Sequence, residues 1–340
     1  MAAIVEAVRL YKVFRVAKDR RGLLGALRGL LSREGREIKA VDDISFVIGS
    51  GEFVGYLGPN GAGKSTTIKM LSGILHPSSG EVRVAGMSPQ RSRREVVRRL
   101  GVVFGQRTQL WWDLPVRDSL ELLAAMYGVK PADYRATLRR FDEMLEIGGF
   151  LDTPVRKLSL GQRMRADLVA AWLHRPPVVF LDEPTIGLDA VAKRRIREFL
   201  REINRSEGTT ILLTTHDMDD IEQLCSRVMV INHGKLVYDG DLEGMRRAVG
   251  VPSEMRVEFA SAPAGEPRGP WTLISQEGAA VRIAFDRSRC TAADVISALS
   301  RYGEIRDVYM SEPDIERVIE QMYHENDRFG KDERERERVR

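Results

Sequence analysis

Short apolar runs alternate with amphipathic segments along the first two thirds of the chain. The runs Glu52–Leu57, Val178–Leu181 and Thr210–Leu213 are almost continuously apolar, as is typical of strands buried on both faces of a parallel sheet. Between them, Thr66–Leu75 and Ala192–Glu202 carry apolar residues at helical spacing. Strands that alternate with helices predict an α/β fold built on a mainly parallel sheet.

The pattern changes near Val251, and residues 260–270 are rich in Ala, Gly and Pro. We therefore expect a first domain over residues 1–248 and a small α/β accessory or regulatory domain over 253–325. Residues 326–340 are charged without an apolar anchor, which predicts a disordered tail. The elements expected in the second domain are strands at Met255–Phe259, Val281–Phe285 and Ile305–Tyr309, and helices at Ala292–Arg301 and Asp314–Tyr323.

A segment with leucines at helical spacing and arginines beside them interrupts the first domain, and we expect a helical insertion at about 16–37. Two interpretations are open. The helix lies on an anionic membrane surface, or it packs on its own domain, and the several glycines favour packing.

Composition narrows the class of protein. The 340 residues are 43% apolar and carry a net charge of only +4, which gives no sign of a nucleic-acid partner. The two cysteines, Cys225 and Cys290, have neither metal nor redox spacing, which favours a reducing cytosol. We identify no secretory signal and no apolar run of membrane-spanning length, so any path across a membrane must come from another chain.

The segment GPNGAGKST matches the phosphate-binding P-loop pattern and lies between a predicted strand and a predicted helix. Glycines allow successive backbone N–H groups to surround phosphate oxygens, Lys64 adds positive charge, and the Ser65 hydroxyl is a ligand for Mg²⁺. This motif predicts a nucleotide triphosphatase. Its expected ATP-binding residues are Gly58, Pro59, Asn60, Gly61, Ala62, Gly63, Lys64, Ser65 and Thr66.

Two carboxylates end the apolar run in VVFLDEP. Asp182, at the end of the strand, is placed to bind the Mg²⁺ shell, and Glu183 is placed to polarise the attacking water. An exposed acidic turn would explain the two acids, but it would not explain why they follow a buried strand.

The order of these and later motifs resembles the nucleotide-binding domain of ABC transporters over residues 1 to about 245. The resemblance implies a P-loop cassette with a mainly parallel sheet and a helical subdomain. It assigns Gln106 to the Q-loop, in contact with Mg²⁺ and water, Asp189 to the D-loop, and His216 to the switch histidine that contacts the γ-phosphate. It also implies that Phe14 stacks on adenine, although Arg15 stands where the family has glycine. A core position for Phe14 is the alternative.

LSLGQ resembles the family signature LSGGQ, with Leu160 in place of glycine. Ser159 stands at an expected helix N-cap, so the segment is a second anion-binding surface, formed with Gly161 and Gln162. In the family, the signature of one subunit faces the P-loop of another. The resemblance therefore implies a dimer, formed with an identical chain or a close homologue, that binds ATP between the subunits.

QLWWDLP resembles the ATPases that partner ABC-2 type permeases, which mostly export drugs, lipids or glycans. Trp111 and Trp112 are interpreted either as a contact for the permease or as core residues of the helical subdomain. The expected function is thus ATP hydrolysis, at the inner face of the membrane, that drives a separate permease. An importer ATPase, a translation factor and a repair ATPase are the alternatives. The last two conflict with the single cassette and the absence of heptads.

Overall fold

The computed structural model describes residues 2–17, 35–105, 107–250, 252–287, 289–311 and 315–323. The chain divides into two compact units, Met1–Gly240 and Asp241–Arg340. The expected helix within the insertion and the expected disordered tail lie outside the described residues, as does Gln106. The ends of the predicted insertion, residues 16–17 and 35–37, belong to strands.

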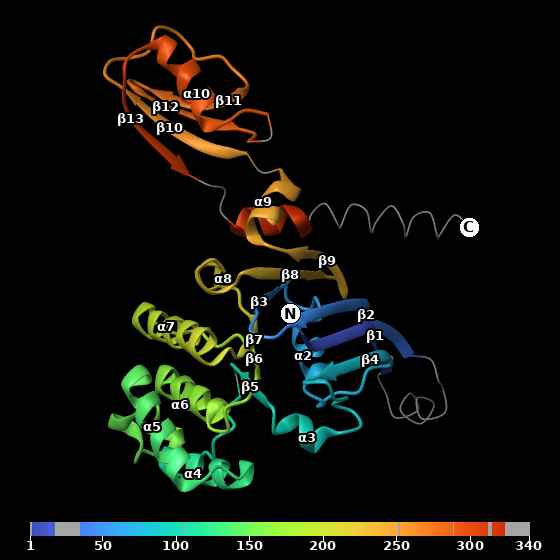
Figure 1. The fold of residues 1–340 in the computed structure, drawn as a ribbon. Helices are drawn as coiled ribbons and strands as arrows, with labels where there is room; N and C mark the ends of the chain where they lie inside the picture. The colour runs from blue at the N-terminus through green and yellow to red at the C-terminus, as the bar shows by residue number, and fades with distance from the viewer. Residues whose placement is uncertain are drawn as a thin grey trace, which may run out of the picture. The chain divides into compact units, whose positions relative to one another are not determined.

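A six-stranded sheet organises the first unit, in the order β5-β6-β7-β3-β8-β9 (Figure 1). Every neighbouring pair is parallel except β8 and β9. The three predicted apolar runs form adjacent strands of this sheet, which confirms the mainly parallel fold. The strands are β3 (Phe53–Leu57), β5 (Leu100–Phe104), β6 (Val178–Asp182), β7 (Thr210–Thr214), β8 (Arg227–Asn232) and β9 (Lys235–Gly240).

A second sheet in this unit is antiparallel, in the order β2-β1-β4, and it was not predicted. Its strands are β1 (Ala3–Ala17), β2 (Gly35–Gly49) and β4 (Ser79–Val84). Helix α2 (Lys64–Leu71) packs its buried Ile68 and Leu71 into one apolar core with residues of both sheets. This shared core fixes the start of α2, where the P-loop ends.

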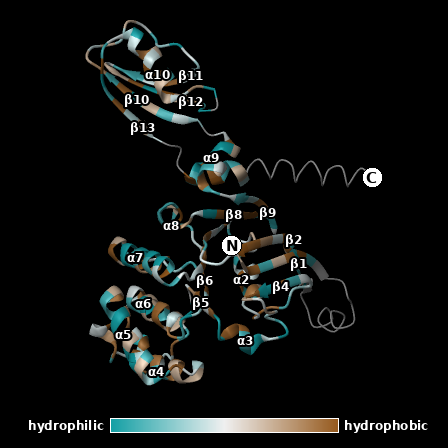
Figure 2. Cartoon of the chain, viewed as in Figure 1, coloured by the Kyte–Doolittle hydropathy of each residue, from teal (hydrophilic) through white to brown (hydrophobic). Residues whose placement is uncertain are grey.

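The remaining helices of the first unit follow from their apolar spacing. In α7, for example, Ile196, Phe199, Leu200 and Ile203 are buried, while most of the intervening residues are charged (Figure 2). The helices are α3 (Arg93–Val97), α4 (Val116–Tyr127), α5 (Pro131–Leu145), α6 (Leu160–Trp172), α7 (Ala190–Glu207) and α8 (Met218–Leu224).

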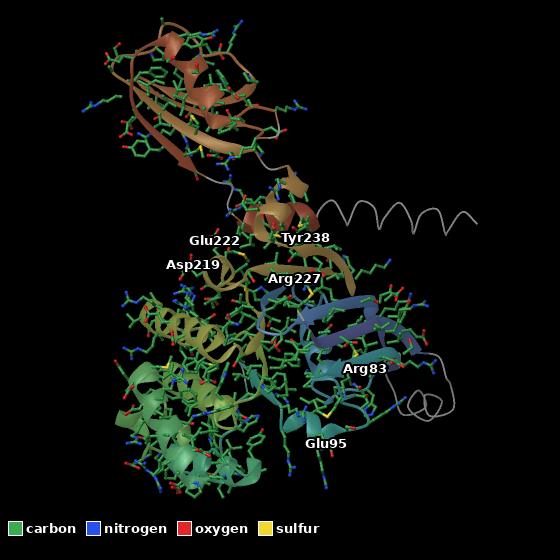
Figure 3. All side chains as sticks on the ribbon, viewed as in Figure 1. Arg83, Glu95, Asp219, Glu222, Arg227 and Tyr238 are labelled. Atoms are coloured by element: carbon green, nitrogen blue, oxygen red, sulfur yellow. The ribbon has the colours of Figure 1, made fainter. Side chains whose placement is uncertain are left out.

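Several predicted helix bounds are wrong, among them those of the helix after the P-loop. The helix expected at Thr66–Leu75 begins at Lys64 and ends at Leu71, since Gly73 takes a left-handed φ of 71°. Strand β8 begins at Arg227 (Figure 3). The Arg227 guanidinium donates to Asp239 of β9 at 2.6 and 2.7 Å and to Glu52 at 2.9 Å.

The second unit contains a four-stranded antiparallel sheet, in the order β11-β12-β10-β13, so the small α/β domain has an antiparallel sheet of its own. Helix α10 packs against one face of it through Val295 and Leu299. Strand β11 was not predicted. The elements are α9 (Leu242–Val249), β10 (Ser253–Phe259), β11 (Trp271–Glu277), β12 (Ala280–Phe285), α10 (Ala292–Leu299), β13 (Ile305–Ser311) and a helix over 315–323.

The described helices include none with the length and apolar character needed to cross a bilayer.

A buried carboxylate in α6 makes the stability of the first unit depend on pH. Asp167 is 4% exposed, and its Oδ1 accepts from the Thr108 hydroxyl at 2.8 Å and the Gln109 N–H at 3.0 Å. Burial raises the pKa of Asp167 to about 6, despite these hydrogen bonds. Because the folded pKa lies above the unfolded one, the native state binds the proton more tightly, and stability falls as pH rises between about 4 and 6.

Asp167→Asn should therefore stabilise the protein at neutral pH, because it removes the buried charge and keeps an oxygen in the Oδ1 position. The free energy of unfolding, measured in urea from pH 4 to 8, should favour the variant by on the order of 2 kcal/mol at pH 7. The difference should shrink toward pH 4. A variant that is less stable than wild type at every pH would contradict this assignment.

Candidate functional site

The P-loop connects β3 to the N-terminus of α2. Gly63 takes a φ of 111°, and a Cβ at Gly58 would lie 2.4 Å from the Ile231 carbonyl oxygen, so the loop needs glycine at both positions. No side chain caps α2, so its first N–H groups are available to an anion.

Lys64 is held inside this loop. Its Nζ donates to the carbonyl oxygens of Gly58 at 2.5 Å and Pro59 at 3.2 Å. Burial lowers the pKa of Lys64, while the charges of Glu183 and Asp182 act in the opposite direction. The loop carbonyls thus accept hydrogen bonds from the ammonium, and the two carboxylates favour its charged form.

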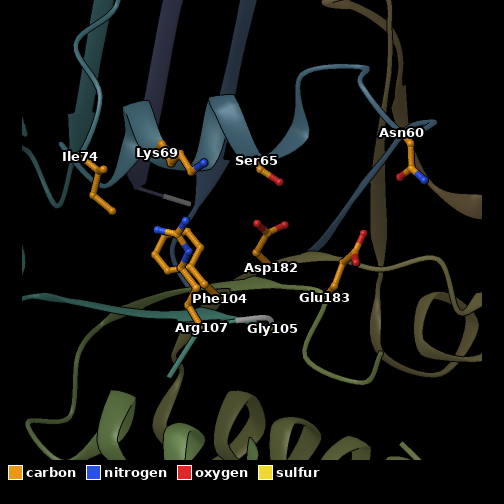
Figure 4. A pocket seen from close by; sticks show the side chains of 9 residues that line it. All are labelled: Asn60, Ser65, Lys69, Ile74, Phe104, Gly105, Arg107, Asp182 and Glu183. Carbon is orange, nitrogen blue, oxygen red and sulfur yellow. The ribbon is translucent and has the colours of Figure 1, made fainter. Parts of the chain in front are cut away.

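A cavity of about 440 Å³ lies in front of the P-loop. In Figure 4 the Ser65 hydroxyl and the Asp182 carboxylate point toward the same space, below the start of α2. The start of α2 and the end of β6 therefore meet at a single cavity. The lining residues are Asn60, Ser65, Lys69, Ile74, Phe104, Gly105, Arg107, Asp182 and Glu183.

Strand β7 holds the Asp182 carboxylate and the Glu183 backbone through Thr214, a residue that sequence reasoning missed. The Thr214 hydroxyl donates to Asp182 Oδ1 at 2.7 Å, and its carbonyl oxygen accepts from the Glu183 N–H at 2.9 Å. Glu183 has a φ of 57°, a conformation that non-glycine residues rarely adopt and that turns the chain sharply after β6. The only sequence signal for Thr214 is its place two residues before His216.

His216 contacts Glu183 directly. The distance from His216 Nε2 to Glu183 Oε1 is 2.8 Å, and the His216 side chain is 46% exposed. The two residues are 33 positions apart in the sequence, and the adjacent strands β6 and β7 bring them together. The Glu183 carboxylate and the His216 imidazole are thus in contact with each other beside the cavity, where a water molecule could bind to both.

The signature segment caps α6. The Ser159 hydroxyl accepts from the Gln162 N–H at 3.2 Å, and the Gln162 side chain accepts from the Ser159 N–H at 2.9 Å. Ser159 is thus the N-cap, as predicted, and the helix begins at Leu160. A Cβ at Gly161 would meet only side-chain atoms at 3.6 and 3.8 Å, so this chain by itself does not require glycine there.

The other predicted residues lie on separate elements. Asp189 is the N-cap of α7 and accepts from the Ala192 N–H at 2.8 Å. Phe14 is 38% exposed, with Lys12 Nζ 5.2 Å from its ring centroid, so the alternative of a core position is wrong. Trp111 and Trp112 are 40% and 49% exposed, so they do not fill the core of the helical subdomain.

Comparison with known proteins identifies relatives of this chain. The family model for "ABC transporter" matches residues 41–186. The ABC transporter ATP-binding protein NatA of Bacillus subtilis is 34% identical over 208 residues, which cover 61% of this chain and 84% of NatA. The Nod factor export ATP-binding protein I of Paraburkholderia xenovorans is 40% identical over 204 residues, 60% of this chain and 66% of that protein.

A solved ATP-binding subunit of an ABC transporter has the same fold. It superimposes with a TM-score of 0.61 at 26% identity, over 73% of this chain and 93% of that structure.

Proposed function

Since the chain belongs to the ATP-binding proteins of ABC transporters and is an ATP hydrolase, we propose that it energises export through a separate ABC-2 type permease. The cargo class proposed is a drug, lipid or glycan. The name of the relative from Paraburkholderia xenovorans refers to export, and QLWWDLP resembles the ATPases of such exporters. The working form is a dimer at the inner face of the cell membrane, formed with an identical chain or a close homologue.

The pairing of Glu183 with His216 beside the P-loop carries the catalytic part of the proposal. Glu183 accepts a hydrogen bond from water and directs a lone pair of the water oxygen at the γ-phosphorus. As the bond from the water oxygen to phosphorus forms, the water gives a proton to Glu183, the bond from phosphorus to the β–γ bridging oxygen breaks, and ADP leaves with that electron pair. His216 orients Glu183 before binding and then contacts the γ-phosphate.

Mg²⁺ fits the oxygen donors at the cavity. The described residues contain no cluster of three or more His, Cys, Asp or Glu for a metal, whereas Mg²⁺ bound with ATP needs few protein ligands and takes oxygens from phosphate and water. Ser65 and Asp182 would hold it, together with Gln106 by family resemblance. When bound, it neutralises charge on the β- and γ-phosphates.

The signature supports a dimer. Ser159, Gly161 and Gln162 form a helix N-terminus that is exposed or half-buried, and no contact among the described residues explains the glycine. A glycine without an internal reason fits close approach by a group from outside, and phosphate bound to a second P-loop is such a group. Asp189 caps the neighbouring α7, and Phe14 is accessible for stacking on adenine.

Trp111 and Trp112 support a permease contact. Both are exposed, as are Leu122 and Met126 of α4, at 46% and 70%. Exposed tryptophans are enriched at protein interfaces, where one or two of them carry much of the binding energy.

Replacing Trp111 and Trp112 by alanine should weaken capture of the permease from detergent-solubilised membranes by roughly tenfold or more. ATP affinity of the free subunit serves as the folding control. Tyr309→Ala, which removes an aromatic ring that is 53% exposed in the second unit, is the matched control and should leave capture intact. Capture of no integral membrane protein by the wild type, or equal capture by both variants, would contradict the proposal.

A further inference from the structure

Asp220 of α8 lies at the centre of a buried polar network. The carboxylate is fully buried, and it accepts hydrogen bonds from Thr185 Oγ1 at 2.5 Å, Thr215 Oγ1 at 2.9 Å and Arg197 Nε at 2.5 Å. These partners are themselves 2–7% exposed. Burial of a charge is costly unless it is paired and hydrogen-bonded, and here both carboxylate oxygens are satisfied.

Two partners of Asp220 flank the residues proposed to handle water. Thr185 follows Glu183 by two positions, and Thr215 immediately precedes His216. Both threonines donate to the same oxygen, Oδ2. One buried atom therefore ties together the two segments that carry the Glu183–His216 pair.

The network continues through Asp217, the residue after His216. Its carboxylate accepts from Lys193 Nζ at 2.5 Å and from Arg197 at 3.0 Å, and its N–H donates to Thr215 Oγ1 at 3.0 Å. Lys193 and Arg197 belong to α7, the helix that Asp189 caps. Asp219, on the same helix as Asp220, lies 3.6 Å from Arg197 (Figure 3).

Apart from the hydrogen bonds between the Glu183 N–H and Thr214, the reactive pair is held through its neighbours in the sequence. His216 is 46% exposed in its side chain, and Glu183 takes a strained backbone conformation. Conformations of that kind persist only when their surroundings over-determine them. The residues on either side of His216, and the residue two positions after Glu183, supply that constraint through Asp220.

We propose that Asp220 is a positioning residue for ATP hydrolysis, which sets the spacing of Glu183 and His216 and links it to α7 and hence to the Asp189 end of that helix. This inference rests on the proposed roles of Glu183 and His216. It predicts that loosening the network slows the hydrolytic step and leaves ATP binding in place.

The test is the double variant Thr185→Val, Thr215→Val in the full chain. Valine keeps the shape of threonine and removes the two hydrogen bonds to Asp220 and the one that Thr215 accepts from the Asp217 N–H, while Asp220 stays paired with Arg197. We expect kcat to fall by about tenfold or more, with KM changed by less than about twofold. Thr137→Val is the matched control, because Thr137 is a buried threonine with an arginine partner, Arg175, remote from the site. Asp220→Asn should lower kcat as well, and Asp220→Glu should recover part of the loss.

Two further measurements distinguish a positioning role of Asp220 from a purely structural one. The chain has five histidines, so the His216 ring resonances can be assigned in a nitrogen-15 spectrum with the His216→Ala variant. In the double variant the His216 signal should shift or broaden, and that of His76 should stay in place. In a His216→Ala background, the two threonine replacements should reduce the residual single-turnover rate by a smaller factor than in the wild-type background, because only the constraint on Glu183 is then lost.

Unchanged kcat and an unchanged His216 signal in a folded double variant would overturn the inference. The inference would also be overturned if the two threonine replacements lowered the hydrolysis rate by the same factor in the wild-type and His216→Ala backgrounds. Failure of the proposed function looks different, because His216→Ala alone would then hydrolyse ATP at the wild-type rate.

Discussion

Glu183→Gln should nearly abolish steady-state ATP hydrolysis, with a loss of about 10²- to 10⁴-fold, the range typical of a general base. The replacement is close in shape, and its oxygen can still accept the hydrogen bond that His216 makes at 2.8 Å. The carboxylate charge that polarises water is lost. ATP affinity should remain, and the dimer should accumulate in an ATP-bound state.

Phosphate release measures turnover, and size-exclusion chromatography with ATP measures dimer trapping. Glu198→Gln is the matched control, since it makes the same chemical change on an exposed position of α7. Normal turnover in Glu183→Gln would exclude Glu183 as the base. Loss of ATP binding would show instead that Glu183 supports the site structurally.

The parallel sheet could be predicted because its strands are short, apolar and separated by amphipathic helices. The antiparallel sheet could not, because its central strand, β1, lacks a regular alternation. In β1, the pairing register with β2 shifts between Ala7 and Leu10, and Arg9 takes a φ of 47°. Such a bulge reverses the face on which later side chains point, so the period of two is lost.

The site could be predicted wherever one local pattern carries its chemistry. The P-loop and the two carboxylates follow directly from short segments that join a strand to a helix or end a strand. The contact between Glu183 and His216 could not, because it depends on the order of strands in the sheet. Asp220 was missed for another reason, since an acidic residue in a short helix normally lies at the surface, and only tertiary structure shows it buried at 0% exposure.

The mixed dimer of Lys64→Ala and Ser159→Arg should recover nucleotide-dependent closure that neither homodimer shows. If a P-loop faces the signature of the partner subunit, both lesions fall on one composite site, and the opposite site keeps Lys64 and Ser159 intact. Each homodimer has two damaged sites. Loss of a charge-assisted phosphate contact costs roughly 1.5–3 kcal/mol, so Lys64→Ala alone should weaken ATP binding by roughly 10- to 100-fold. Arginine at 159 removes the cap of α6 and places a long side chain where that helix approaches phosphate.

Differently tagged subunits allow the mixed dimer to be isolated. The readout is ATP binding at near-micromolar nucleotide rather than hydrolysis, because coupling between the two sites can suppress hydrolysis even when one site is intact. The expected result is one tight site per mixed dimer and none in either homodimer. Ser79→Arg, at an exposed position of β4, is the matched control for Ser159→Arg, and its mixture with Lys64→Ala should also give one tight site. The Ser79→Arg homodimer should have two tight ATP sites, whereas the Ser159→Arg homodimer should have none. A mixed dimer of Lys64→Ala and Ser159→Arg that forms without a tight site would mean that each chain uses its own signature, and the glycine at 161 would then need another explanation.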